Sequence, residues 1–373
     1  MAPSVPPTPS LNLSRSTPPS PTSRVPKKAP RPKKARAPAS RPSTGGISKV
    51  KSKKDFTTSV LQNPLLVDFS DPEALERGQS KHRPSKLYRY HFENAATLSL
   101  FVNKINHISH KEVPDLKFQD GNAFQSIGTF KPNLDITKER IHRHYKGTMM
   151  KEPTPCISAM SSLKDAEDIV RKMYKNRTSA PRRLLIAEID VSRLEPATLK
   201  TTMSTTQVNH SPDKSDPRTS STTDRDVEIP IWVLDAVPYE GPPADRPSRT
   251  LDEILDSGGL IWLSVNELTR SDMELWAMKS HENEWLAMSR IPEDLITNVM
   301  PFDGAVPHTR KGHEVVRSRG TEEIYLWNFD IRQWVHDPDL TDFHPYRRAR
   351  AGERRRPGDS DDESGSDSDS EAA

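Results

Sequence analysis

The two ends of this 373-residue chain carry charge of opposite sign, and the composition of these ends limits how much of the chain can fold. No acidic residue precedes Asp55, whereas lysine and arginine are frequent there, and the segment 359–371 is rich in Asp and Glu without one basic residue. Such segments cannot bury enough apolar surface to offset the entropy of ordering. Hydrophobic residues make up only 32% of the chain and prolines number 34. We therefore expect one middle-sized folded domain between two disordered tails.

The composition changes along the chain set the expected boundaries. Residues 1–84 are expected to be a disordered, basic, Pro/Ser-rich tail, and residues 85–302 the folded domain. Residues 303–346 are expected to be an extension that packs on the domain, and residues 347–373 a disordered tail that is first basic and then acidic. Residues 200–226 are rich in Ser, Thr and Asp without apolar periodicity, which predicts a low-complexity surface insertion within the domain.

The tails also bear on where the protein acts. The first residues contain no apolar run typical of a secretory signal, and no segment is apolar for long enough to span a bilayer. The single cysteine, Cys156, excludes an intramolecular disulfide framework. We expect a nuclear or cytoplasmic protein that is not secreted and does not enter a membrane. Two Lys-Lys pairs within residues 26–36 predict contact with a nuclear import receptor, or with nucleic acid. The alternative is a solubilising tail to which no partner binds.

Strands dominate the middle of the chain and helices occur mainly in its first half, which favours an α+β domain. Capping and periodicity predict helices, and short β-branched or aromatic runs predict strands. The helices are expected at 71–76, 95–108, 135–144 and 162–175, and the strands at 87–91, 156–158, 183–191, 229–237, 260–265 and 285–291.

Two histidines two positions apart, His142 and His144, suggest a metal site at first sight. Side chains two apart on a helix diverge, however, and no third ligand has suitable local spacing. We expect no metal.

A pair of carboxylates, Glu282 and Glu284, precedes the apolar run that ends at Ile291-Pro292. Residues two apart on a strand face the same way, so we expect both carboxylates to project together. Two like charges that close repel, which is costly in a core and useful in a cleft. The alternative is the solvated face of an edge strand.

Two further segments precede this pair in the chain. Residues 87–90 read Leu-Tyr-Arg-Tyr, and residues 156–163 form a serine-rich strand end that leads into a helix. The order of arginine, serine and Glu-x-Glu resembles that of mono-ADP-ribosyltransferases of the enterotoxin-like class. It is also similar to a group of fungal proteins that carry a diverged domain of this kind. The resemblance covers roughly residues 86–302, but the usual Ser-Thr-Ser triplet is not intact.

This resemblance implies a split, two-sheet domain with NAD in the cleft between the sheets. Arg89 would hold a phosphate or ribose oxygen, and either Tyr90 or an aromatic residue of a loop would stack on the nicotinamide. Ser158 or Ser161 would hold the ribose or orient the catalytic carboxylate; the two serines compete for one position.

The resemblance assigns different roles to the two glutamates. Glu284 would stabilise the oxocarbenium-like transition state, and Glu282 would activate the acceptor. The implied function is transfer of ADP-ribose from NAD to a protein acceptor. The alternative is a catalytically inactive, diverged domain that acts as a nuclear interaction module. In that case Arg89 would form an ordinary ion pair and the serines would only begin a helix.

Overall fold

A computed structural model of the chain describes residues 56–81, 83–93, 95–102, 116–145, 153–176, 183–209, 219–273, 275–276, 281–309, 316 and 325–336. The basic segment 26–36 and the tail 347–373 lie outside the described residues, as do parts of the expected extension 303–346. The predictions made for those segments stay predictions.

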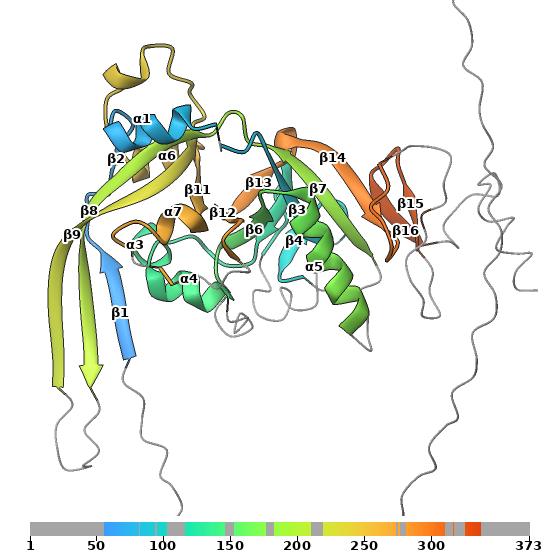
Figure 1. Cartoon of the computed structure of the whole chain (residues 1–373), viewed down its shortest axis with the longest axis horizontal. Helices are drawn as coiled ribbons and strands as arrows, with labels where there is room; N and C mark the ends of the chain where they lie inside the picture. The colour runs from blue at the N-terminus through green and yellow to red at the C-terminus, as the bar shows by residue number, and fades with distance from the viewer. Residues whose placement is uncertain are drawn as a thin grey trace, which may run out of the picture. The chain divides into compact units, whose positions relative to one another are not determined.

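The described residues form a mixed α+β fold built mostly from antiparallel strands, as the sequence predicts (Figure 1). The largest sheet has eleven strands in the order β10-β2-β8-β9-β11-β12-β6-β3-β7-β14, and β1 pairs with β8. Its strands are β1 (Phe56–Leu61), β2 (Leu66–Asp68), β3 (Lys86–His91), β6 (Cys156–Met160), β7 (Leu184–Asp190), β8 (Glu195–Asn209), β9 (Thr219–Leu234), β10 (Arg249–Thr250), β11 (Leu260–Ser264), β12 (Glu284–Met288) and β14 (Ile296–Phe302).

Two smaller sheets and several helices complete the described fold. One small sheet has the order β13-β5-β4, with strands Arg290–Pro292, Asn122–Ser126 and Thr97–Ser99; the other pairs β15 (Tyr325–Asn328) with β16 (Gln333–His336). The helices are α1 (Pro72–Gln79), α3 (Pro132–Asp135), α4 (Lys138–Tyr145), α5 (Leu163–Asn176), α6 (Leu251–Asp256) and α7 (Val265–Leu268), with 3-10 turns η1 (Pro243–Asp245) and η3 (Glu293–Leu295).

Local signals placed several elements correctly. Asp71 caps α1, because its side chain accepts hydrogen bonds from the backbone N–H groups of Glu73 and Ala74, and Pro72 is the first helical residue. Ser162 caps α5 by accepting from the backbone N–H of Asp165 at 3.1 Å. The strands expected at 183–191, 229–237 and 260–265 correspond to β7, β9 and β11.

The expected start of the domain at residue 85 is wrong, because residues 56–81 belong to the fold. β1 pairs with β8 along its whole length, from Phe56 opposite Val208 to Leu61 opposite Met203. Leu61, Val67 and Phe69 are buried in the same core cluster as the central strands. Three short apolar runs separated by prolines give no extended periodicity, so composition alone assigned them to the tail.

The expected insertion at 200–226 is exposed at residues 219–226, as a surface segment would be, but its described part is a paired portion of the large sheet. β8 and β9 form one continuous antiparallel ladder from Glu195 opposite Val233 to Asn209 opposite Thr219, and Figure 1 shows this long hairpin with β1 beside it. Threonine is β-branched and favours strands, and pairs such as Thr206 and Thr222 contact across the ladder at 3.1 Å. Every residue of β9 up to Asp226 is exposed, which removes the apolar alternation that identifies a strand.

The helix expected at 95–108 is not found in the described residues 95–102, where β4 pairs with β5 instead. Leu98 and Phe101 are both buried. Their spacing of three suits one helical face, but the chain reaches the same core by a short strand and a bend.

The centre of the large sheet is packed on both faces. Cys156, Leu286 and Met288 join one core cluster on one face of β6 and β12. Ile157 and Ala287 join a second cluster on the opposite face. β3 lies on the other side of β6, but the two strands pair only at Tyr88 opposite Met160. β3 and β6 therefore part beyond this single pair, whereas β6 and β12 pair over five residues.

Candidate active site

The parting of β3 from β6 lies where three of the sequence-predicted residues meet. Ser158 on β6 is opposite Leu286, and Met160 is opposite Glu284 on β12. Alternation along these paired strands places the side chains of Ser158 and Glu284 on the same face of the sheet. Tyr88, opposite Met160, shares that face, and Tyr90 follows by the same alternation.

Arg89 points to the other face of the sheet, where its guanidinium contacts β6 and the small sheet that contains β4. Its Nη1 donates to the backbone carbonyl of Ser158 at 2.5 Å, and its Nη2 donates to the hydroxyl of Thr97 at 3.1 Å. The guanidinium carbon lies 5.6 Å from the ring centre of Phe124. Arg89 is only 7% exposed, and its Nε has no hydrogen-bond partner among the described residues.

The electrostatic surroundings of Arg89 include both neighbouring site residues. Burial lowers the pKa of Arg89 to about 10, while the charges of Tyr90 and Glu284 act in the opposite direction. The guanidinium therefore stays protonated at neutral pH. Burial raises the pKa of the Tyr90 phenol. Arg89 is thus a buried cation with a carboxylate close enough to affect its charge.

Ser158 is held by a histidine from the last turn of α4. His144 places Nε2 2.7 Å from the hydroxyl oxygen of Ser158 and Nδ1 2.8 Å from the hydroxyl oxygen of Thr154. Burial lowers the pKa of His144 to about 4; the charges of Arg89 and His281 lower it further and that of Glu284 opposes them. The imidazole is therefore neutral at pH 7, with one nitrogen as donor and the other as acceptor.

Glu284 is 4% exposed and is held by a second histidine. Nδ1 of His281 lies 2.5 Å from Oε2 of Glu284. The imidazole of His281 stacks on the ring of Tyr145, with ring centres 4.3 Å apart and an interplanar angle of 27°. Tyr145 follows His144 on α4, so this turn of the helix contacts Ser158 directly and contacts Glu284 through His281.

The two remaining predicted residues, Ser161 and Glu282, lie elsewhere. Both line a cavity of about 790 Å³ together with Trp232, Asn283 and Trp285. The expectation that Glu282 and Glu284 face the same way is wrong, because β12 begins at Glu284 and Glu282 is an exposed turn residue. The turn is fixed by Asn283, whose carbonyl accepts from the backbone N–H of Ser161 at 2.9 Å and whose amide donates to Asp165 at 3.0 Å.

His144 and His281 are the functional candidates that the sequence did not identify. The pair His142 and His144 was noticed only as a metal ligand pattern. In the structure, His142 contacts the carbonyl oxygen of Trp276 at 3.0 Å, away from Ser158. Among the described residues, no group of three or more His, Cys, Asp or Glu side chains could hold a metal ion. No sequence signal links His281, three positions before Glu284, to that carboxylate.

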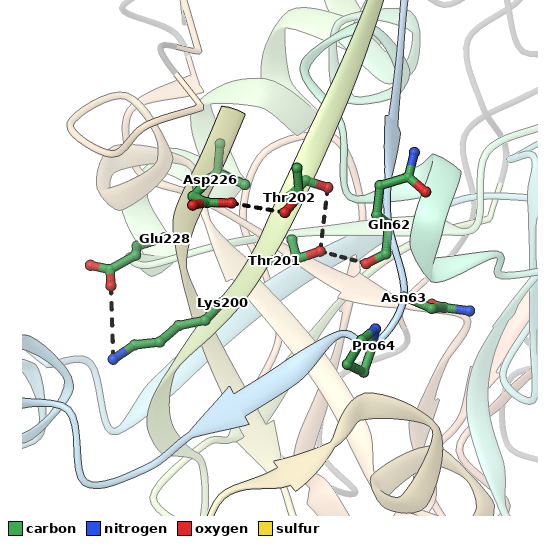
Figure 2. A pocket seen from close by; sticks show the side chains of 9 residues that line it. Gln62, Asn63, Pro64, Lys200, Thr201, Thr202, Asp226 and Glu228 are labelled. Atoms are coloured by element: carbon green, nitrogen blue, oxygen red, sulfur yellow. Dashed lines mark hydrogen bonds and ion pairs between the residues drawn. The ribbon is translucent and has the colours of Figure 1, made fainter. Parts of the chain in front are cut away.

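A separate polar depression lies where β8 and β9 pass the loop after β1 (Figure 2). Its polar groups bond to one another: Thr202 donates to Asp226 at 2.8 Å, and Thr201 donates to the carbonyl of Gln62 at 2.6 Å. Lys200 pairs with Glu228 at 3.8 Å, and more closely with Asp68 and Asp71, at 3.0 and 3.1 Å. This network ties β2, β8 and the start of α1 together, which is a structural role.

No helix of the described part of the chain is both long and apolar enough to cross a membrane. Comparisons of the chain with protein-family models, with curated proteins and with solved structures find no match.

Proposed function

We propose that this chain is an ADP-ribosyltransferase-like protein that binds NAD and transfers ADP-ribose to a protein acceptor. One observation carries the proposal: an arginine, a serine and a glutamate from three distant segments lie around the point where β3 and β6 part. The order of these residues along the chain is the one that the resemblance requires.

The chemistry of the three groups suits the cleavage of a nicotinamide–ribose bond. Arg89 is a fixed cation whose buried Nε lacks a partner among the described residues, which suits a phosphate or ribose oxygen. Ser158 supplies a hydroxyl for the ribose, and Glu284 supplies negative charge for an oxocarbenium-like transition state. Of the two competing serines, Ser158 is therefore the one assigned to the site.

The cavity that Glu282 lines gives this residue a role separate from that of Glu284. Glu282 lines the cavity of about 790 Å³ with Ser161, a size typical of ligand pockets. We assign this cavity to the acceptor side of the reaction, with Glu282 as the acceptor-activating carboxylate. Tyr90 stays assigned to the nicotinamide.

The test is incubation of the full chain with labelled NAD, with and without a cell lysate, measuring nicotinamide release and label on protein. Glu284→Gln should abolish NAD cleavage, since it removes the charge and little volume. Glu282→Gln should preserve hydrolysis and reduce transfer to protein. Glu293→Gln, an exposed glutamate in the turn η3, is the matched control and should behave as the unaltered chain. Equal NAD cleavage by the Glu284→Gln variant and the unaltered chain would refute the assignment.

A second function is favoured by the burial of the same groups. Arg89 and Glu284 already have protein partners, and His281 contacts one carboxylate oxygen of Glu284, Oε2. A chain in which these contacts only stabilise the fold, and in which NAD does not bind, would be a catalytically inactive interaction module. Titration calorimetry with NAD separates the two functions, because only the enzyme requires binding.

The tails complete the proposal. We assign the basic segment 26–36 to a nuclear import receptor, which places the protein in the nucleus as well as the cytoplasm. In the interaction-module function the same segment would also contact nucleic acid. Binding of the isolated N-terminal segment to DNA that weakens steeply with salt would support that second function.

A further inference from the structure

The last turn of α4 presents two adjacent aromatic side chains to the candidate site. His144 contacts Ser158 directly, and Tyr145 contacts the imidazole that holds Glu284. The rings of His144 and Tyr145 are themselves 5.9 Å apart at 64°. The serine and the glutamate of the site are therefore both held from one helical turn, although they lie far apart in the chain.

Each contact restricts a side-chain torsion that would otherwise let the hydroxyl of Ser158 or the carboxylate of Glu284 take several positions. A serine hydroxyl has three staggered χ1 wells, and a glutamate has two staggered torsions and a third that is broad. His144 is itself fixed at both ring nitrogens, by Thr154 on one side and Ser158 on the other. His281 is fixed by one hydrogen bond and by stacking on Tyr145. A chain of contacts therefore fixes both oxygen-bearing side chains before any substrate binds.

We propose that His144, Tyr145 and His281 form a positioning clamp, in which His144 orients the hydroxyl of Ser158 and His281, stacked on Tyr145, orients the carboxylate of Glu284. The proposal rests on the function proposed above. The clamp residues act through Ser158 and Glu284, so they are positioning residues and not catalytic ones. Holding reacting groups in place before binding lowers the barrier to reaction, and misplacement by about 1 Å costs up to about 100-fold in rate.

The test compares a variant that deletes each imidazole with one that preserves its key nitrogen. His281→Asn keeps an N–H donor near the position of Nδ1, whereas His281→Ala removes it. His144→Gln keeps a polar group near the position of Nε2, whereas His144→Ala removes it. His142→Ala is the matched control, because His142 is on the same helix and contacts only the carbonyl of Trp276 among the interactions found for it.

The expected result is a loss in turnover and not in affinity. Each alanine variant should lower kcat for NAD cleavage by roughly 10- to 100-fold while the Kd for NAD stays nearly unchanged. The Asn and Gln variants should recover most of that loss, and His142→Ala should match the unaltered chain. Equal losses in the alanine and amide variants, or a loss confined to Kd, would overturn the clamp.

A measurement without turnover separates the clamp from the function on which it rests. Histidine-labelled protein should show a slowly exchanging Nδ1–H resonance for His281 by NMR, which Glu284→Ala removes and Glu293→Ala leaves in place. An unchanged resonance in Glu284→Ala would overturn the clamp geometry. Absence of NAD cleavage by the unaltered chain, with this resonance behaving as expected, would overturn the proposed function and the clamp's catalytic role while its geometry stands.

Discussion

Acid should destabilise this protein through His144 before the carboxylates of Asp68, Asp71 and Asp303 are protonated. Burial lowers the pKa of this imidazole from its ordinary 6.5 to about 4, with Arg89 and His281 contributing in the same direction and Glu284 opposing them. Between these two pH values the His144 imidazole is protonated in the unfolded chain but stays neutral in the folded chain. The free energy of unfolding therefore falls as the pH drops from 6.5 towards 4, and the loss stops once the folded form is protonated too.

The magnitude follows from the shift. A difference of about 2.5 pKa units corresponds to about 3 kcal/mol, at a limiting slope of about 1.4 kcal/mol per pH unit. A protein of ordinary stability has roughly 5–15 kcal/mol in total, so this one residue removes a measurable fraction of it. The carboxylates of Asp68, Asp71 and Asp303 have pKa values lowered by their partners, so their contributions are lost only at lower pH.

The assay is urea unfolding of the full chain at a series of pH values from 7.5 to 4, with and without His144→Gln. The substitution has its own structural cost, but glutamine does not titrate, so only the slope against pH is informative. The stability advantage of the unaltered chain over His144→Gln should shrink by about 3 kcal/mol across this range. Identical slopes for the unaltered chain and His144→Gln would refute the burial argument.

Three further predictions concern the fold and the tails. Asp71→Ala should lower the free energy of unfolding by about 1 kcal/mol, because the α1 cap is lost, while Asp71→Asn keeps most of it; urea unfolding measures both, and equal stability of the alanine variant would count against the cap. Deleting residues 1–55 should leave the melting temperature unchanged, whereas deleting residues 1–84 should prevent folding because β1, β2 and α1 are removed; circular dichroism decides, and a folded shorter chain would contradict the corrected boundary. Replacing the four lysines of residues 26–36 with alanine should leave a tagged protein in the cytoplasm, and an unchanged nuclear signal under the microscope would remove the import assignment.

The sequence predicted correctly those elements that depend on interactions between residues close together in the chain. The cap at Asp71 and the cap at Ser162 depend on residues within one helical turn, and both are found as expected. The β8–β9 ladder could not be predicted in the same way. Up to Asp226 its residues on β9 are exposed on both faces, so apolar and polar residues do not alternate there. The pairing depends on hydrogen bonds to the partner strand and not on a buried apolar face.

The candidate site was predictable only in part, for a related reason. Arg89, Ser158 and Glu284 were selected by their resemblance to a known order of residues, and strand register places the last two on one face. Glu282 was misplaced because the rule for residues two apart requires both to lie on a strand, and β12 starts at Glu284. His144 and His281 were missed because their roles come from tertiary contacts to Ser158 and Glu284, which local sequence does not encode.

The position of β6 between β3 and β12 has a consequence for how the chain is made. Arg89 and Ser158 are separated by 69 residues, and β12 is synthesised much later than either, after the whole β8–β9 hairpin. During translation, at about 5–20 residues per second, β6 and β11 both lack a pairing partner on one edge until β12 is synthesised. A chain truncated before β12 would therefore lack Glu284 and would also expose two unpaired strand edges, on β6 and β11. Unpaired strand edges are sites of aggregation. Quality control by chaperones should matter most for this protein while the ribosome is between residues 264 and 288.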